Sequence, residues 1–101
     1  MTLKYLSNNL RKIYLSWLDW LKLERNFADN TILAYDNDIL HFWQFLSNHN
    51  GGDIDKNILQ TITIKDIRSW LTKRKMQNFS NNSNSRALSS LKSFAKYLYK
   101  Y

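Results

Sequence analysis

Apolar side chains recur along most of the chain at intervals of three and four residues, the spacing that places them on one side of an α-helix. The first such stripe predicts a helix over about residues 7–25, followed by a polar break over residues 26–30. Its members are Leu6, Leu10, Ile13, Trp17, Trp20 or Leu21, and Glu24. The pattern therefore indicates an amphipathic helix near the start of the chain.

A second helix is predicted to begin at Asp29 or Asn30, because either side chain is a good N-cap. It should end near residues 47–50, before Gly51 and Gly52, where a backbone with positive φ costs little. The stripe that we expect to face the core is Ile32, Tyr35, Ile39, Phe42, Trp43 and Leu46. The opposite face carries Ala34, Asn37, Asp38, His41 and Gln44.

The next part of the chain contains one ambiguous stretch and a third helical pattern. Residues 53–62 could form a short helical turn with its apolar side chains inward. The run from Thr63 to Asp66 resembles a capping box, which predicts a helix that begins there and frays around residues 76–78. Its inward residues should be Ile64, Ile67, Trp70 and Leu71, and its outward residues Lys65, Arg68 and Lys73.

A loop rich in capping residues, over residues 78–84, leads into the last helix. The core stripe of this helix should be Leu88, Leu91, Phe94 or Ala95, and Leu98. Its opposite face carries Asn82, Arg86, Ser89, Ser93, Lys96 and Lys100. Together the four patterns predict an all-α fold, a compact bundle of four to five helices that forms a single domain over residues 1–101.

Composition supports a small helical domain with a packed core. The 101 residues include four Trp, six Tyr and five Phe, enough apolar surface to disfavour intrinsic disorder. Most of these rings fall on the helical stripes, so we expect them in the core. Valine, proline and cysteine are absent, which limits strand formation and leaves no disulfide framework. No apolar run approaches the length of a membrane span, so we expect a soluble, intracellular domain.

The charge is unevenly distributed along the sequence. The whole chain has 15 Lys and Arg against 8 Asp and Glu, a formal charge of +7. Residues 1–55 have five basic and seven acidic residues, a net −2, whereas residues 56–101 have ten basic residues and the single acid Asp66, a net +9. Such asymmetry favours an anionic partner, nucleic acid first and a membrane surface second. The alternative is a basic face that only keeps the domain soluble.

The sequence contains little that could catalyse a reaction. His41 and His49 have no partners at the spacing of a zinc site, and no nucleophile motif or glycine-rich phosphate loop is present. Asp36 and Asp38 fall on different faces of their helix, which does not suit a general acid–base pair. We therefore expect no catalytic residue, no metal and no cofactor in this chain, and an autonomous enzyme is disfavoured.

The outer face of the last helix is the strongest candidate for binding. Short hydroxyl and amide side chains alternate there with Lys and Arg over several turns, and no acid interrupts them. Ser and Asn can donate to phosphates or base edges, while Arg and Lys add charge, so such a helix could lie in a major groove of DNA. The amides at its N-terminus, near residues 80–82, would suit a phosphate. In the alternative, Ser and Asn only cap the helix and Lys only solvates it.

Three segments resemble motifs of one family. Residues 30–46, NTILAYDNDILHFWQFL, resemble the pattern sxnTlxaYxxDlxxFxxfL of tyrosine recombinases. Residues 62–71, ITIKDIRSWL, resemble its itxxDirxyl, and residues 79–98, FSNNSNSRALSSLKSFAKYL, resemble its lSxxtxxRxLSalRxFyxYL. In order and spacing the three are similar to the N-terminal core-binding, SAM-like domain of Xer-type recombinases and phage integrases. The chain departs from the family pattern at Asn78, where glycine is usual, and at Ala87 and Lys92, where arginine is common.

The resemblance implies that the chain is the non-catalytic part of an enzyme. In the family the catalytic residues, including a nucleophilic Tyr, lie in a separate C-terminal domain, which this chain would lack. No H-x-x-R motif follows His41 or His49, and none of the six Tyr is assigned as the nucleophile. Matching positions to the family pattern gives as DNA-binding candidates Asn30, Thr31, Ser80, Asn81, Arg86, Ser89, Ser90 and Lys92. Lys96 is added from its charge and helix face alone.

The function implied by the resemblance is sequence-recognising binding of double-stranded DNA by the clamp domain of a site-specific tyrosine recombinase. Its setting would be DNA integration, recombination or chromosome dimer resolution in the bacterial cytoplasm, with further recombinase subunits in a tetramer on the DNA. The main alternative is a helical protein-interaction module without DNA affinity. A basic membrane-surface domain is disfavoured, because the apolar stripe opposite the cations is needed for the core. The sequence leaves open the target site and the partner recombinase. It also leaves open whether the parent protein is an Xer-type recombinase, a phage integrase or a transposon integrase.

Overall fold

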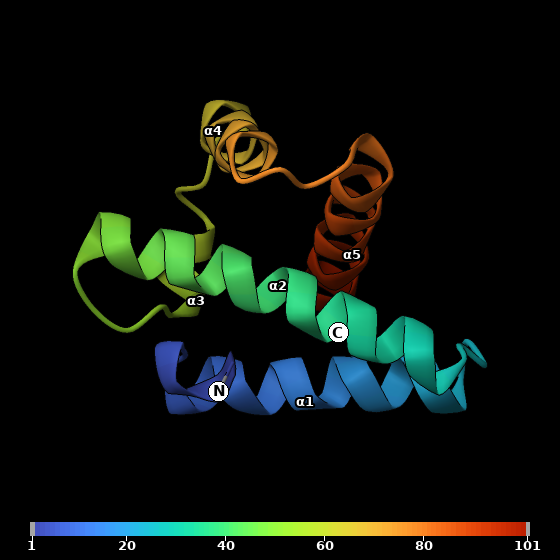
Figure 1. Cartoon of the computed structure of the whole chain (residues 1–101). Helices are drawn as coiled ribbons and strands as arrows, with labels where there is room; N and C mark the ends of the chain where they lie inside the picture. Colours follow the sequence, from blue (N-terminus) through green and yellow to red (C-terminus); the bar gives the residue numbers. More distant parts are fainter. Residues whose placement is uncertain (1, 101) are drawn as a thin grey trace.

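The computed structural model describes residues 2–100, which fold into helices joined by short connections (Figure 1). A short 3₁₀ helix, η1, comes first and is followed by five α-helices within the described residues. Their bounds are η1 Thr2–Tyr5, α1 Asn8–Leu23, α2 Asp29–Asn50, α3 Lys56–Leu59, α4 Ile64–Met76 and α5 Asn81–Lys100. The predicted all-α bundle of four to five helices is confirmed.

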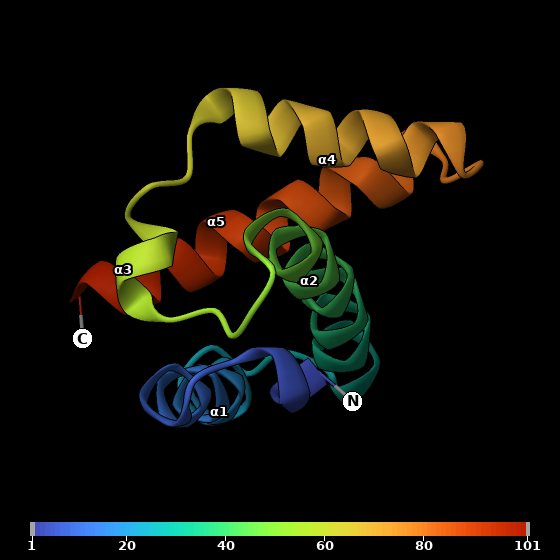
Figure 2. The ribbon, with the colours of Figure 1, turned by 90° about the vertical axis from the view of Figure 1, so that its left-hand side faces the viewer.

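The helix α2 is the centre of the arrangement. It contacts η1, α1 and α5, and α5 in turn contacts α1 and α4. The helices α1 and α2 run alongside each other, whereas α4 and α5 lie across them (Figures 1 and 2). Backbone hydrogen bonds from Ser7 to Ile54 and from Ile54 to Tyr5, both 2.8 Å, tie the start of the chain to the segment before α3.

The core between these helices is mainly aromatic. Tyr14 is fully buried and lies with its ring centroid 5.6 Å from Trp17, 6.0 Å from Trp43 and 5.6 Å from Phe94. The pairs with Trp43 and Phe94 are edge-to-face, and such pairs each add about 0.5–1.5 kcal/mol beyond the burial of their area. The other fully or nearly fully buried apolar residues are Leu6, Leu10, Leu21, Ile39, Phe42, Phe45, Leu46, Ile54, Trp70, Ala87 and Leu98.

Several predicted helix ends are confirmed, and their causes are local. Gly51 ends α2 with φ 71°, and its N–H donates to the carbonyl of Ser47 at 2.7 Å. Thr63 and Asp66 form the predicted capping box at the start of α4. The helix α2 does begin at Asp29, but the N-cap residue is Ala28, which has no side chain to cap with. Asp29 instead lies in the first turn, where its negative charge interacts favourably with the positive end of the helix dipole.

Asn78 explains one departure from the family pattern. Its φ is 72°, in the left-handed region that glycine adopts freely and that asparagine tolerates better than most other residues. This residue turns the chain between α4 and α5. Asparagine at this position of the chain therefore meets a backbone requirement that glycine would also meet.

The predicted core faces need four corrections. Tyr14 is buried on α1 although the stripe did not include it, and Ile64 is 70% exposed because it is the first residue of α4 and projects past the core. Asp38, predicted on the outer face of α2, is buried. On α5 the fully buried residues are Ala87, Ser90, Phe94 and Leu98, whereas Leu88 and Leu91 are half-buried.

Over the residues that the structure describes, every helix is too short or too polar to cross a membrane.

Candidate nucleic-acid interface

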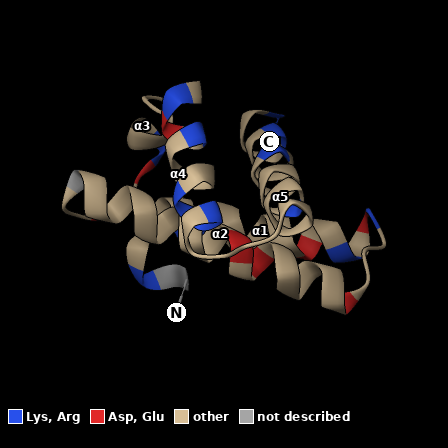
Figure 3. Ribbon diagram, turned by 45° about the horizontal axis from the view of Figure 1, so that its top comes forward, with Lys and Arg blue, Asp and Glu red and all other residues tan. Residues whose placement is uncertain are grey.

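Most of the basic half of the sequence folds into two neighbouring helices, α4 and α5. Lys and Arg lie along α4 and α5, whereas most Asp and Glu lie on α1, on α2 and in the connections (Figure 3). The helix α5 has no acidic residue anywhere along its 20 residues. Its exposed cations are Arg86, Lys92, Lys96 and Lys100. This distribution gives α5 a cationic surface without acids of its own.

The outer face of α5 presents several of the predicted site residues to solvent. Ser89, Lys92 and Lys96 are exposed, and Arg86 precedes them by one turn with its side chain 45% exposed. We call Arg86, Ser89, Lys92 and Lys96 the α5 face. Asn30 and Thr31 are also exposed, in the first turn of α2.

Ser80 and Asn81 lie at the N-terminal end of α5 and are exposed. The Oγ of Ser80 accepts the backbone N–H of Ser83 at 3.0 Å and also donates to the Oγ of Ser83 at 3.1 Å. Ser80 thus caps the helix, as the capping alternative anticipates. Asn81 is the first residue of the helix.

Ser90 lies apart from the other candidates. Its side chain is fully buried, and its Oγ donates to the carbonyl of Ala87 at 2.7 Å. One residue further along a helix turns the side chain by about 100°, so Ser89 faces solvent while Ser90 faces the core. In this structure a duplex could not contact Ser90, and we leave it out of the α5 face.

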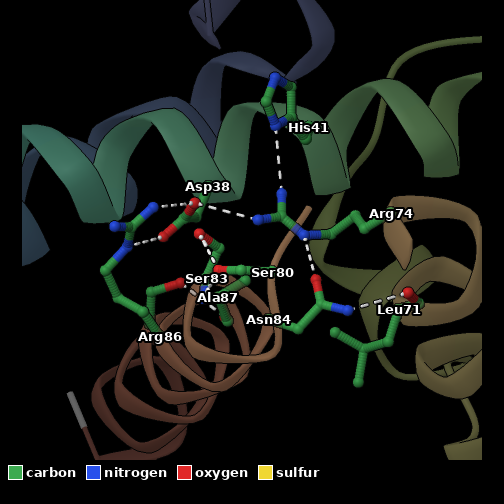
Figure 4. Close-up of polar contacts among 10 residues, drawn as sticks. Asp38, His41, Leu71, Arg74, Ser80, Ser83, Asn84, Arg86 and Ala87 are labelled. Carbon is green, nitrogen blue, oxygen red and sulfur yellow. Dashed lines mark hydrogen bonds and ion pairs between the residues drawn. The ribbon is translucent and has the colours of Figure 1, made fainter. Parts of the chain in front are cut away.

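Beneath the α5 face lies a buried polar cluster that joins α2, α4 and α5 (Figure 4). The carboxylate of Asp38, which is 2% exposed, accepts Nε of Arg86 at 2.8 Å and Nη2 of Arg86 at 3.0 Å. It also accepts Nη2 of Arg74 at 3.5 Å. A two-pronged pair of this type fixes the plane of the guanidinium as well as its distance.

Arg74 is the buried member of the cluster, at 1% exposed. Its Nε donates to Oδ1 of Asn84 at 2.9 Å, and its Nη1 lies 3.2 Å from Nδ1 of His41. Its guanidinium carbon also lies 4.0 Å from the ring centroid of Phe79. Asn84 in turn donates to the carbonyl of Leu71 at 3.2 Å, which joins α5 to α4.

The cluster shifts the pKa values of its members in directions that follow from its contacts. Hydrogen bonds to Asp38 raise the pKa of Arg86. Burial lowers the pKa of Arg74, and the charge of Asp38 opposes that shift. Burial and the nearby charge of Arg74 lower the pKa of His41. Because a guanidinium only donates, Nδ1 of His41 must accept, so this ring is neutral with its proton on Nε2.

Asp38 and Arg74 were not identified as a pair from the sequence, although the spacing of each from a buried aromatic residue indicates a core-facing position. Arg74 follows the buried Trp70 by four residues, and Asp38 precedes the buried Phe42 by four residues, so each lies on a core-facing side of its helix. A charged residue at such a position is almost always paired when buried. The partner itself lies 36 residues away and has no local signal.

Other residues with potential chemistry are engaged in packing. The phenol of Tyr14 donates to Oδ1 of Asp36, and burial raises its pKa, so this group stays protonated. Within residues 2–100, His, Asp and Glu side chains form no group of three or more that could hold a metal ion.

The fold and this surface define a class: a small all-α domain with a cationic helical face and a buried ion-pair cluster beneath it. The family model for the phage integrase N-terminal, SAM-like domain matches residues 15–101. The chain belongs to this family.

Curated relatives point in the same direction. The chain is 40% identical over 92 residues to a protein named tyrosine recombinase XerC from Rickettsia typhi, and 39% identical over 92 residues to the one from Rickettsia prowazekii. A relative of the same name from Rickettsia bellii is 34% identical over 95 residues. These alignments cover 91–94% of this chain but only 30–31% of each relative. No solved structure gives a significant match.

Proposed function

We propose that this chain is the DNA-binding domain of a tyrosine recombinase and that it holds double-stranded DNA through the α5 face and the first turn of α2. Membership of the phage integrase N-terminal family supports this assignment. The observation that carries it is the α5 face, where Arg86, Lys92 and Lys96 line a helix that contains no acid. A surface of this kind attracts the phosphate backbone whatever the base sequence.

Arg86 has two roles in this proposal. Its Nε and Nη2 bind Asp38, and among the described residues none accepts a hydrogen bond from its Nη1. With 45% of the side chain exposed, the Nη1 side of the guanidinium remains available to a phosphate. Asp38 thereby holds Arg86 in one orientation, which reduces the side-chain entropy that binding would otherwise cost.

The proposal extends to the protein of which this domain would be a part. The relatives are named tyrosine recombinases, and the chain spans about 30% of their length. We propose that strand cleavage and exchange are performed by residues outside this chain, in a complex with other recombinase subunits on DNA. The proposed setting is DNA recombination in the bacterial cytoplasm, and this domain contributes binding and no catalytic residue.

The salt dependence of duplex binding tests the proposal. If about five or six phosphates are neutralised, the logarithm of the affinity should fall with the logarithm of salt concentration with a slope of about −4 to −6. Fluorescence anisotropy with a labelled duplex at several salt concentrations measures this slope. An affinity that is absent, or flat between low and moderate salt, contradicts the proposal and favours a protein-interaction module.

Matched charge reversals locate the surface. Lys92→Glu on the α5 face should weaken duplex binding strongly, whereas Lys12→Glu on the exposed side of α1 should have little effect. Both variants change the net charge by the same amount, so a general electrostatic effect would act on both equally. Equal losses of affinity would contradict the assignment of the α5 face.

A further inference from the structure

A groove borders the α5 face on the side of the connection between α1 and α2. One wall is formed by Arg25 and Phe27 of that connection together with Tyr35 of α2. The other wall is formed by Ser89, Lys92 and Lys96 of α5. The groove has a volume of about 290 Å³. Arg25 was not among the residues that the sequence motifs singled out for binding.

The backbone around Arg25 brings its side chain to the rim of this groove. The N–H of Arg25 donates to the carbonyl of Trp20 at 3.2 Å, and the N–H of Phe27 donates to the carbonyl of Leu21 at 3.0 Å. Between them Asn26 adopts φ 55°, a left-handed conformation that reverses the chain at the end of α1. The position of Arg25 is therefore set by the helix end rather than by a free loop.

Two aromatic rings hold the guanidinium of Arg25. Its central carbon lies 5.5 Å from the ring centroid of Trp20 and 5.6 Å from that of Phe27. Both distances are within the range of a cation–π contact. A cation–π contact uses the charge of the guanidinium and none of its N–H hydrogen bonds, so these contacts leave Arg25 able to donate to an anion.

The wall behind Arg25 is connected to α5 through the core. Phe27 packs edge-to-face on Tyr35 with centroids 5.8 Å apart, and Tyr35 stacks on Trp17 at 6.4 Å. The Nε1 of Trp17 donates to Oγ of Ser93 on α5 at 3.2 Å. This chain of contacts fixes the spacing of the two walls, so the groove is formed before a ligand arrives.

The charged residues that line the groove are all positive. Arg25, Lys92 and Lys96 line it, and among the described residues no carboxylate does. The nearby Asp29 pairs with Lys22 at 3.4 Å. Like charges that converge on one concave surface raise the potential there and favour an anion. The hydroxyl of Ser89 adds an uncharged donor of the kind that contacts phosphates.

We propose that this groove holds a phosphate of the DNA backbone, with Arg25 contacting it from one wall and Lys92 and Lys96 from the other. The proposal rests on the DNA-binding function given above, because the groove shares Ser89, Lys92 and Lys96 with the α5 face. It extends the contact surface from α5 to the end of α1. Arg25 is thereby assigned as a phosphate contact that positions the duplex without reading its bases.

Arg25→Gln and Arg25→Lys test the assignment in the same anisotropy titration with a mixed-sequence duplex. Arg25→Gln should bind more weakly and have a salt slope shallower by about one unit, because one phosphate contact is lost. Arg25→Lys should keep the slope of the unchanged protein, since its charge is retained. Arg68→Gln, which removes an exposed arginine from α4, is the matched control and should leave the slope unchanged.

The outcomes separate this inference from the proposed function. If the unchanged protein binds with a steep salt slope but Arg25→Gln has the same slope, the groove assignment is overturned and the DNA-binding function stands. If Arg25→Lys loses as much of the slope as Arg25→Gln, Arg25 acts through packing and the assignment is again overturned. If the unchanged protein does not bind duplex DNA, the proposed function itself fails.

Discussion

Two groups of basic residues, one in the buried cluster and one on the outer side of α5, behave in opposite ways. In the buried cluster, Arg74 is 1% exposed and shares the carboxylate of Asp38 with Arg86. On the outer side of α5, Lys92 and Lys96 are exposed and have no acid on their own helix. The first group contributes to stability, and the second is available to a ligand. The net charge of the sequence counts the buried arginines and the exposed lysines alike. What distinguishes the two groups is the position of Asp38, which pairs with the arginines and not with the lysines.

The largest effect should come from removing that acid. Asp38→Ala leaves Arg74 buried without its counter-charge, and breaking a buried pair in this way costs about 3–5 kcal/mol. We expect a loss near the lower end, since Arg86 is half exposed and water screens its share. Chemical denaturation measures the change in unfolding free energy, and Asp19→Ala on the exposed side of α1 is the control. A loss no larger than that of the control would show that the cluster is not structural.

On the α5 face, removing charges should reduce DNA binding and leave stability nearly unchanged. The double variant Lys92→Gln, Lys96→Gln should lower duplex affinity and make the salt slope shallower by about two units, because two cations are removed. Its unfolding free energy should stay within about 0.5 kcal/mol of the unchanged protein, as is usual for exposed positions. Anisotropy titration and chemical denaturation of the same preparation test the expected loss of binding and the expected unchanged stability. A stability loss comparable to that of Asp38→Ala would erase the distinction between the two groups.

Of the two groups, the buried cluster should give the stability a pH dependence, through His41. The pKa of His41 is lowered in the folded protein, so the unfolded chain binds its proton first as the pH falls. This contribution to stability is therefore fully present above the ordinary histidine pKa of about 6.5 and is lost as the pH drops toward the lowered folded value. His41→Asn, whose amide oxygen can still accept from Arg74, should flatten the decrease in unfolding free energy between neutral and mildly acidic pH.

His49→Asn is the control for that experiment, because His49 lies exposed in the last turn of α2, outside the cluster. It should retain the pH dependence of the unchanged protein. An identical pH profile for His41→Asn and the unchanged protein would remove His41 from the cluster's energetics.

The smallest effects should separate two adjacent serines. Ser90→Ala removes a buried hydrogen bond to Ala87 and should lower the unfolding free energy by about 0.5–1.5 kcal/mol with no change in the salt slope. Ser89→Ala, on the exposed side, should leave stability unchanged and weaken duplex binding slightly. If Ser90→Ala affected binding more than stability, Ser90 would return to the candidate interface.

Features that depend on residues close in the sequence could be predicted, whereas features that depend on distant residues could not. Helix ends were predictable where the cause is local, as at Gly51 and in the capping box of Thr63 and Asp66. The burial of Asp38 was missed because it depends on Arg74 and Arg86, which lie 36 and 48 residues away. Three- and four-residue spacing shows that a residue faces inward, but it does not say which other helix supplies the partner.

The surface positions of the candidate site were predictable to the same degree. The motif positions and the helix face of α5 predicted Ser89, Lys92 and Lys96, all of which the structure exposes on one side. Arg25 lies in the half of the chain with the negative net charge, so charge counting pointed away from it. Its proximity to Lys92 and Lys96 arises only when the end of α1 packs beside α5.

The central claim, that the α5 face holds duplex DNA, is tested most directly by mapping which residues respond to DNA. A ¹⁵N-labelled sample titrated with a short duplex reports each backbone amide by nuclear magnetic resonance. We predict that the shifted amides lie over residues 86–96 of α5, at the start of α2 near residues 30–31, and around residue 25. Shifts confined to α4 or to the outer side of α1, with α5 unaffected, would contradict the account.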